Sequence, residues 1–315
     1  METIRVTAQE YEKLVPDRRV FFNEPKFTEL NKEKMDEVLY LIIRKGNSPR
    51  FGVIIGKRGE KGRVPFSAPY SYPVSIKNDA GMQDFDDALS SLEAYCAQQG
   101  IRELRFVLPP FLYDEDILSA WVSSMYRAGY QPLNIDLNYT LNLEQLNQAQ
   151  YPQLLGKKAR SHLKKAMSSG IEIIRCETDE QYREAYDIVV ENHTAKSRPT
   201  HMSFEQLKDT FALVPHEAFV ARLEGQPIAS MIYYGVTGEI VQCIYSGYLL
   251  AYSNSGVMNY LTWYAIQFFG NQGYKYIDRA IATEDSIPNY GLCDFKESVG
   301  AKRSLKYSLV KELTT

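Results

Sequence analysis

Residues 252–280 read YSNSGVMNYLTWYAIQFFGNQGYKYIDRA, and this stretch decides the fold. Apolar side chains recur three or four residues apart along it, at Val257, Tyr260, Leu261, Tyr264, Ala265, Phe268 and Phe269. That spacing is typical of one face of an α-helix. Gly273 predicts the end of the helix, because glycine readily takes the left-handed conformation found there. The residues from Tyr274 to Ala280 then predict a strand, so a long helix is followed directly by a strand.

The same order of elements occurs in the first half of the chain. A helical pattern ends at Gly100, a strand follows at Leu104–Leu108, and a second helix ends at Gly129 before another strand. In the second half a short helix ends at Gly300 and a last strand follows. The sequence therefore predicts two copies of one α/β unit. We place the boundary in the polar join around residues 144–150, which gives domains 1–146 and 147–315.

Composition excludes several classes of protein. The 315 residues carry 36 basic and 39 acidic side chains, a net charge of −3, which argues against a DNA-binding surface over the whole protein. Four cysteines and four histidines are dispersed without a C-x-x-C pair, so we expect no metal site and no disulfide framework. No apolar run approaches the roughly 18 residues of a membrane span. The chain begins Met1-Glu2-Thr3 with no apolar leader, and we expect a cytoplasmic protein.

The loop before the long helix is a candidate anion site. Ser253, Asn254 and Ser255 are residues that cap helices, and Gly256 allows a ligand to approach the backbone closely. The unpaired amides of a helix N-terminus, here beginning at Val257, can hold a diphosphate. The alternative is an ordinary capped helix that binds nothing.

A second candidate is the basic segment 156–166, which predicts an amphipathic helix after Pro152. Lys157, Arg160 and Lys164 line one side of it and would attract phosphate or carboxylate groups. The alternative is a basic face that is only solvated.

Two single residues complete the candidates from the pattern alone. Lys296, between Phe295 and Val299 on a short helix, could be partly desolvated in a cleft, or it could be a surface lysine. Asp278 ends a strand, where α/β sheets place ligand groups.

Taken together, these features resemble the GNAT superfamily of acyltransferases, and within it the FemABX-like branch with two tandem GNAT domains. The basic segment from Lys157 to Ile171 is similar to that branch's pattern K-x-x-R-x-x-x-x-K-A-x-x-x-G-I/V. Residues 295–300 are similar to its F-K-x-x-F/Y-G signature, with Val299 in the aromatic position. The tract 252–278 is similar to the loop, helix and strand of a catalytic GNAT half, and residues 65–70 are similar to a tract in related acyltransferases.

The resemblance implies an α/β (α+β) fold of two GNAT-like domains, each a mixed twisted sheet flanked by helices. It also implies a catalytic second domain and a first domain that forms a substrate wall. Acyl-CoA would place its pyrophosphate on the 253–257 loop, and a backbone amide near Tyr245 to Tyr248 would stabilise the oxyanion. These two tyrosines would line the substrate site.

The chain departs from the family at two positions. Phe295 lies near the place of the tyrosine that usually protonates the leaving thiolate, so Tyr290 would substitute for it. The phosphate loop has the single glycine Gly256 instead of the usual two. In FemABX transferases the donor is aminoacyl-tRNA, and the F-K lysine, here Lys296, offsets charge on the reacting ester.

Three functions follow as hypotheses. The first is an N-acyltransferase that uses acyl-CoA and acts on an amino sugar, an amino acid or a peptidoglycan-like amine. The second is a FemABX-like transferase that uses aminoacyl-tRNA and acts on a cell-wall precursor. The third is a non-catalytic GNAT pair that binds an anionic ligand through Lys157, Arg160 and Lys164. The sequence leaves the oligomeric state open.

Overall fold

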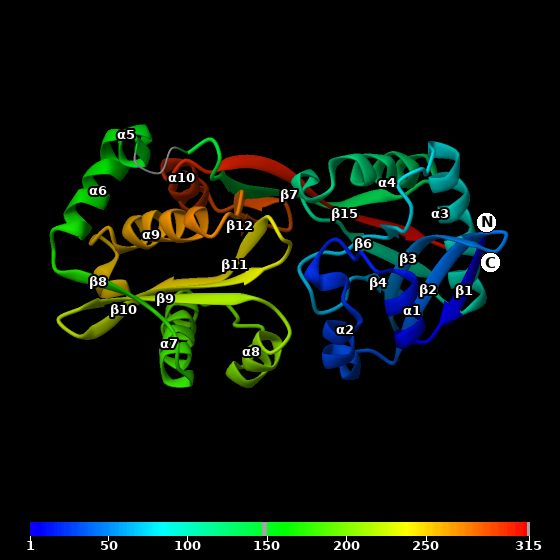
Figure 1. Cartoon of the computed structure of the whole chain (residues 1–315), viewed down its shortest axis with the longest axis horizontal. Helices are drawn as coiled ribbons and strands as arrows, with labels where there is room; N and C mark the ends of the chain where they lie inside the picture. Colours follow the sequence, from blue (N-terminus) through cyan, green and yellow to red (C-terminus); the bar gives the residue numbers. More distant parts are fainter. Residues whose placement is uncertain (147–149, 314–315) are drawn as a thin grey trace. The chain divides into compact units, whose positions relative to one another are not determined.

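The computed structural model describes residues 1–146 and 150–313, which divide into two compact units (Figure 1). Unit 1 contains Met1–Leu137, Asp285–Ile287 and the segment from Ser304 onward. Unit 2 contains Asn138–Glu284 and Pro288–Arg303. Among the described residues, no helix combines the length and the apolar character that a membrane span requires.

Unit 1 has a mixed sheet in the order β1-β2-β3-β4-β6-β15, with β5 beside β3. Helices α1 and α2 lie on one face of this sheet, and α3 and α4 lie on the other (Figure 1). The elements are β1 (Glu2–Val6), α1 (Ala8–Leu14), α2 (Pro25–Asn31), β2 (Glu37–Lys45), β3 (Ser48–Arg58), β4 (Lys61–Val64), β5 (Val74–Ser75), α3 (Met82–Gln98), β6 (Glu103–Val107), α4 (Glu115–Arg127) and β15 (Lys302–Glu312).

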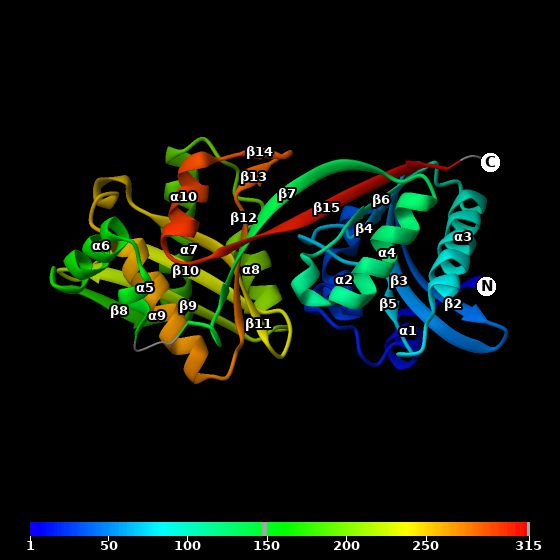
Figure 2. The ribbon, with the colours of Figure 1, turned by 90° about the horizontal axis from the view of Figure 1, so that it is seen from above.

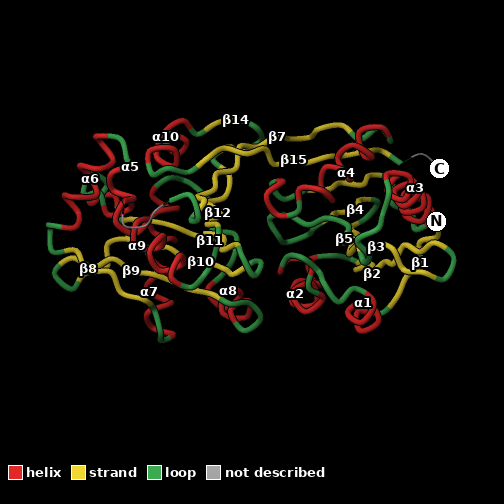
Figure 3. The backbone as a smooth tube through the Cα atoms, turned by 45° about the horizontal axis from the view of Figure 1, so that its top comes forward, coloured by secondary structure: helices red, strands yellow, loops and turns green. Residues whose placement is uncertain are grey.

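Unit 2 repeats this plan with the order β7-β12-β11-β10-β9-β8, to which β7 contributes its part from Asn138 onward. Helices α7 and α8 cover one face, and α9 covers the other together with α6 and α10 (Figures 1 and 3). The elements are β7 (Gln131–Asn142), α5 (Tyr151–Leu154), α6 (Lys157–Met167), β8 (Ile171–Arg175), α7 (Asp179–Ala195), α8 (Phe204–Phe211), β9 (His216–Leu223), β10 (Gln226–Gly235), β11 (Ile240–Tyr248), α9 (Val257–Asn271), β12 (Tyr276–Ile281), β13 (Thr283–Glu284), β14 (Ile287–Pro288) and α10 (Tyr290–Ser298).

The predicted α/β fold with two similar units is confirmed, and its most periodic segment forms the helix α9. Val257, Leu261, Ala265 and Phe269 are buried along one side of α9, four residues apart. Phe219 of β9 packs against this helix, with its ring centroid 5.9 Å from that of Phe269. Complete burial of a large apolar side chain contributes about 1.5–3 kcal/mol, so this face fixes α9 on the sheet.

Each unit is completed by a strand that lies far away in the sequence. In unit 1, Ser308–Glu312 of β15 pair with Glu103–Val107 of β6. In unit 2, residues 138–142 of β7 pair with β12 (Figure 2). The last strand of each half thus completes the sheet of the other half.

This exchange makes the structural division differ from the expected boundary between residues 146 and 147. Residues 147–149 themselves lie outside the described residues. A periodic pattern identifies a strand but not its partner, since any strand satisfies the hydrogen bonds of a sheet edge. The sequence therefore predicts where the strands are but not which strands pair with one another.

We predict that Leu309→Ala loosens unit 1, although this residue follows unit 2 in the sequence. Leu309 is buried and pairs with Phe106, so the truncation should cost about 2–5 kcal/mol. Hydrogen–deuterium exchange should then increase at the amides of β6. Leu305→Ala is the control, because Leu305 is 42% exposed on the same strand and its truncation should change little. Faster exchange confined to β8–β10 would contradict the strand pairing.

Candidate functional site

The loop that precedes α9 is held by its own hydrogen bonds. Gly256 is the N-cap residue and has a φ of 80°, a left-handed conformation that favours glycine. The Ser255 hydroxyl donates to the carbonyl of Tyr252 at 2.7 Å and accepts the amide of Val257 at 3.2 Å. Ser253 and Asn254 are exposed. The five residues expected to hold a diphosphate therefore form one ordered turn at the start of α9.

The basic helix α6 lies directly against this turn (Figure 3). A Cβ atom on Gly256 would be only 2.2 Å from the carbonyl oxygen of His162, so no side chain fits between the two segments. Lys165 Nζ donates to the carbonyl of Asn254 at 3.1 Å. The two anion sites expected from the sequence are thus one place, with the α6 backbone covering part of the helix N-terminus.

The basic residues of α6 divide into two groups. Lys157 and Lys164 are exposed, as are Lys158 and Lys165. Arg160 is half-buried, and its Nη2 donates to the carbonyls of Gln153 at 2.6 Å and Leu155 at 2.9 Å. Arg160 therefore joins α5 to α6, whereas the exposed lysines present charge beside the turn.

Strands β11 and β12 pair along only part of their length. Their parallel ladder covers Ile240–Gln242 and Tyr276–Asp278, although β11 continues to Tyr248 and β12 to Ile281. On its other side β11 contains a bulge at Ile244, where the pairing with β10 shifts by one residue. A bulge leaves a residue outside the ladder and bends the strand. The two strands thus separate beyond Gln242 and Asp278. The unpaired part of β11 then leads through residues 249–256 to the start of α9.

Asp278 is fully buried at the last paired position of this ladder. Its carboxylate accepts hydrogen bonds from Asn138 Nδ2 at 2.8 Å and from Gln242 Nε2 at 3.2 Å. It also accepts the backbone amide of Ala280 at 2.8 Å. These bonds occupy the carboxylate and link β7, β11 and β12, so the geometry gives Asp278 a positioning role.

Lys296 of α10 is buried against β12. Its Nζ donates to the carbonyls of Arg279, Ala280 and Ile281 at 2.6, 2.9 and 2.9 Å. These three consecutive carbonyls converge because Ala280 has a φ of 58°, which makes the end of β12 irregular. Burial, with a smaller contribution from the charge of Arg279, lowers the pKa of Lys296 to about 7. Lys296 thus links α10 to the irregular end of β12.

The three candidate tyrosines lie in different surroundings. Tyr290 is 75% exposed at the start of α10. The ring of Tyr245 is 6.0 Å from that of His193, and the ammonium of Lys196 lies 4.2 Å above the ring of Tyr248. Tyr245 and Tyr248 thus meet the end of α7 beside the region where β11 has left β12. Asp278 and Lys296 are linked through β12, whereas the exposed Tyr290 lies at the other end of α10 from Lys296.

Unit 1 fills the equivalent positions with its own side chains. Asp84 in the first turn of α3 accepts the amide of Gly81 at 3.3 Å and pairs with Lys45 and Arg50. A carboxylate therefore occupies the helix N-terminus, where its negative charge would repel a phosphate.

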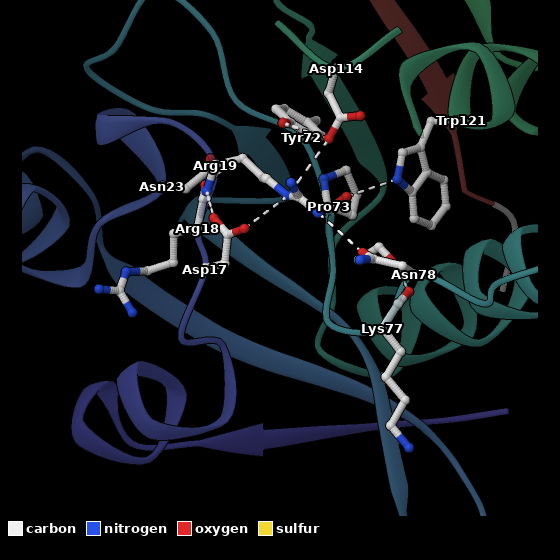
Figure 4. Close-up of polar contacts among 11 residues, drawn as sticks. Asp17, Arg18, Arg19, Asn23, Tyr72, Pro73, Lys77, Asn78, Asp114 and Trp121 are labelled. Atoms are coloured by element: carbon white, nitrogen blue, oxygen red, sulfur yellow. Dashed lines mark hydrogen bonds and ion pairs between the residues drawn. The ribbon is translucent and has the colours of Figure 1, made fainter. Parts of the chain in front are cut away.

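The loops of unit 1 enclose a second polar cluster (Figure 4). The Arg19 guanidinium lies 3.3 Å from the carboxylate of Asp17 and 3.9 Å from that of Asp114. It also donates to Asn78 at 3.2 Å, and Tyr72 donates to Asp114 at 3.3 Å. These groups satisfy one another, so the cluster orders the loops of unit 1.

The residues that sequence reasoning missed are Arg279, Gln242 and Asn138. Arg279 is only 5% exposed on β12, and the other two are buried donors to Asp278. The detectable signal was a pair of adjacent charges, Asp278-Arg279, inside an otherwise apolar strand. Asn138 could not be found, because it reaches the site through the exchanged strand β7.

A separate cavity of about 380 Å³ lies at the other end of the unit 2 sheet. It is lined by residues at the end of α8, the start of β9, the end of β10, the C-terminal part of α9 and the segment before β12, namely Phe211, His216, Tyr233, Phe268 and Tyr274 among others. This cavity is therefore distinct from the region where β11 and β12 part.

Residues 156–296 match the family model described as an acetyltransferase (GNAT) domain. No curated protein matches the chain by sequence. Among solved structures, FemX is similar over 99% of this chain and 98% of its own, at 11% identity and a TM-score of 0.70.

Two further structures have the same architecture. A tandem GNAT protein from the clavulanic acid biosynthesis pathway covers 100% of this chain and 99% of its own, at 7% identity and a TM-score of 0.61. L-PGS from Bacillus licheniformis covers 99% and 94%, at 14% identity and a TM-score of 0.61. At these identities the likeness concerns the fold.

We predict that Gly256→Ala is more damaging than an alanine at another left-handed glycine. Gly273, with a φ of 85° and no atom within 4 Å of an added Cβ, is the control and should lose about 1–2 kcal/mol. Gly256→Ala adds a clash with the α6 backbone and should cost about 1–3 kcal/mol more. Urea unfolding of both variants measures the difference. Equal losses would show that α6 does not pack against this turn.

We predict that Lys296 makes the free energy of unfolding depend on pH in a specific way. Its pKa of about 7 in the folded chain lies below the roughly 10.4 of an unfolded lysine, so the unfolded state binds more protons between these values. The free energy of unfolding should therefore rise with pH over this window relative to Lys296→Met, which lacks the group. Urea unfolding at several pH values between 6 and 10 or so measures the slope. If the free energies of unfolding of the wild type and Lys296→Met differ by the same amount at every pH, the three carbonyls keep Lys296 charged over the whole range.

Proposed function

The chain has the tandem GNAT fold of the FemABX-like type, and from this premise we propose that unit 2 transfers an acyl group to an amine. The main support for this proposal is that β11 and β12 stop pairing beyond Gln242 and Asp278, next to a bulge in β11. An opening between two strands leaves backbone amides of β11 without a strand partner on that side. Such amides can bind the carbonyl oxygen of an acyl donor.

The chemistry requires little from side chains. The nitrogen of a neutral amine attacks the donor carbonyl, and a C–N bond forms as the oxygen becomes an oxyanion. The C–S bond of a thioester, or the C–O bond of an ester, then breaks as the carbonyl reforms. The amine loses one proton and the leaving group gains one. An amide of β11 near Tyr245 would stabilise the oxyanion, and positioning of the two reactants would supply much of the rate.

The acceptor side of this site is the end of α7. Asn192 of α7 is buried and donates to the carbonyl of Tyr248, while His193 contacts Tyr245. Burial lowers the pKa of His193, which keeps the imidazole neutral near pH 7 and able to accept a proton. We assign this side to the amine, for which an amino sugar, an amino acid and a peptidoglycan-like amine remain the candidate classes.

Acyl-CoA is the first candidate donor. Its support is the match of residues 156–296 to the acetyltransferase model and the short connection, residues 249–256, from the unpaired end of β11 to the N-terminus of α9. The diphosphate would then contact the turn from Ser253 to Val257 together with the lysines of α6. On this proposal Lys296 and Asp278 hold β12 in place, and Tyr290 remains the candidate acid only if α10 moves it inward.

Aminoacyl-tRNA is the second candidate donor, and one observation favours it. The α6 backbone already covers part of the α9 N-terminus at Gly256, while Lys157, Lys158, Lys164 and Lys165 are exposed beside it. This arrangement fits a nucleic-acid donor, because lysine side chains can bind the phosphates along its backbone. A cell-wall precursor would then be the acceptor.

We predict that reversing the charge of α6 weakens donor binding. The double variant Lys157→Glu/Lys164→Glu should bind the true donor at least about tenfold more weakly, because each lysine contributes a phosphate contact. Isothermal titration with acetyl-CoA and with aminoacyl-tRNA measures this. For tRNA, the slope of log K against log salt should also fall by about 1–2. The control is Lys26→Glu, an exposed lysine of α2 in unit 1.

Product masses after incubation with each donor and a panel of amines test the transfer itself. A mass increase equal to the acyl group supports the proposal and identifies the donor. If the chain binds an anionic donor tightly and no amine is acylated, the remaining hypothesis is the non-catalytic binding pair. If neither donor binds, the proposed transferase function is wrong.

A further inference from the structure

Arg279 is a buried cation without a carboxylate partner. It is 5% exposed, and its Nη1 lies 3.4 Å from the sulfur of Met231. Its Nε has no hydrogen-bond partner, and among residues 1–146 and 150–313 no acidic side chain forms an ion pair with it. A buried guanidinium normally has such a partner, because an unpaired buried ion costs several kcal/mol.

The surroundings of Arg279 are neutral or positive. The thioether of Met231, the thiol of Cys243 and the phenol of Tyr233 are all buried, and the phenol is a neutral hydrogen-bond partner of the guanidinium. Burial raises the pKa of Cys243 and of Tyr233, so both groups stay uncharged near pH 7. The nearest acidic neighbour in the sequence, Asp278, is occupied by the two amide side chains and a backbone amide described above.

The position of Arg279 connects it to the proposed site. It follows Asp278, the last residue of β12 that pairs with β11, so it lies where the two strands part. Its carbonyl is one of the three that Lys296 binds, which fixes this part of β12. A group that enters between β11 and β12 beyond the ladder therefore comes close to the guanidinium of Arg279, which lies beside Cys243 of β11.

We propose that Arg279 binds an oxyanion, a carboxylate or a phosphate, on the ligand that enters between β11 and β12. This inference rests on the proposed function and narrows it to an acyl donor or acceptor with such a group near the reacting carbonyl. A guanidinium presents Nε and an Nη in one plane, a fork that matches the two oxygens of either group. Met231, a flexible side chain, is the residue that the oxyanion displaces from the guanidinium.

Binding of small anions to the complete chain tests the proposal without any catalysis. The probes are succinate for a carboxylate and inorganic phosphate for a phosphoryl group, each titrated at constant ionic strength against thermal stability and by isothermal titration. Wild-type protein should bind at least one of them. Arg279→Met should bind it at least about tenfold more weakly, since the charged fork is gone. Arg279→Lys keeps the charge without the fork and should show an intermediate loss.

The matched control is Arg222→Met on β9. Arg222 also has an unpaired Nε, but its Nη2 bonds to Glu184 at 2.6 Å. This variant should lose stability and keep the anion response of the wild type. Without anion, Arg279→Met should be at least as stable as wild type, because it removes an unpaired buried charge.

Each outcome decides the inference. Succinate alone identifies a carboxylate on the substrate, phosphate alone identifies a phosphoryl group, and both identify a general oxyanion receptor. No response of the wild type to either probe, or an equal response in Arg279→Met, overturns the proposal. If Arg279→Met does not fold, an undiminished response of Arg279→Lys overturns it. Anion binding without acyl transfer would refute the proposed function alone, and transfer without anion binding would refute this inference alone.

Discussion

The short ladder between β11 and β12 is the constraint on which the rest of unit 2 depends. Three residues of each strand pair with each other. Beyond Asp278 this pairing stops, and β11 stays paired with β10 and β12 with β7. Backbone groups without a strand partner are costly in a protein interior unless other groups satisfy them. Lys296 satisfies three carbonyls of β12, and Asn138 and Gln242 hold the carboxylate that fixes the preceding residue. These bonds keep β12 in its irregular path, apart from the end of β11.

The contact between α6 and α9 places basic side chains at the turn that follows β11. A helix N-terminus alone offers only backbone amides, and here part of it is covered by the carbonyl of His162. The covering helix also brings exposed lysines to this place. On the proposed function, a donor's phosphates would be attracted by flexible side chains as much as by fixed dipoles. This distinguishes unit 2 from unit 1, where Asp84 occupies the corresponding helix start.

The sequence was informative where local pattern determines structure. The periodic apolar face of residues 257–269 predicted α9, and the glycine after it predicted where the helix stops. The repeated order of helices and strands predicted two similar units, and the basic helix and the capping loop were both recognisable. The strand exchange could not be predicted, because pairing across more than 130 residues leaves no local signal. The same reason hid Asn138, and the burial of Lys296 and Arg279 became evident only with the fold.

The central claim is that ligands bind where β11 and β12 part. The most direct measurement is hydrogen–deuterium exchange of the complete chain with and without the donor that proves active. The account predicts slower exchange at residues 243–248 of β11 and 279–282 after the ladder, with the turn before α9 protected as well. Protection confined to the residues around His216 and Tyr274, at the cavity on the opposite end of the sheet, would contradict it.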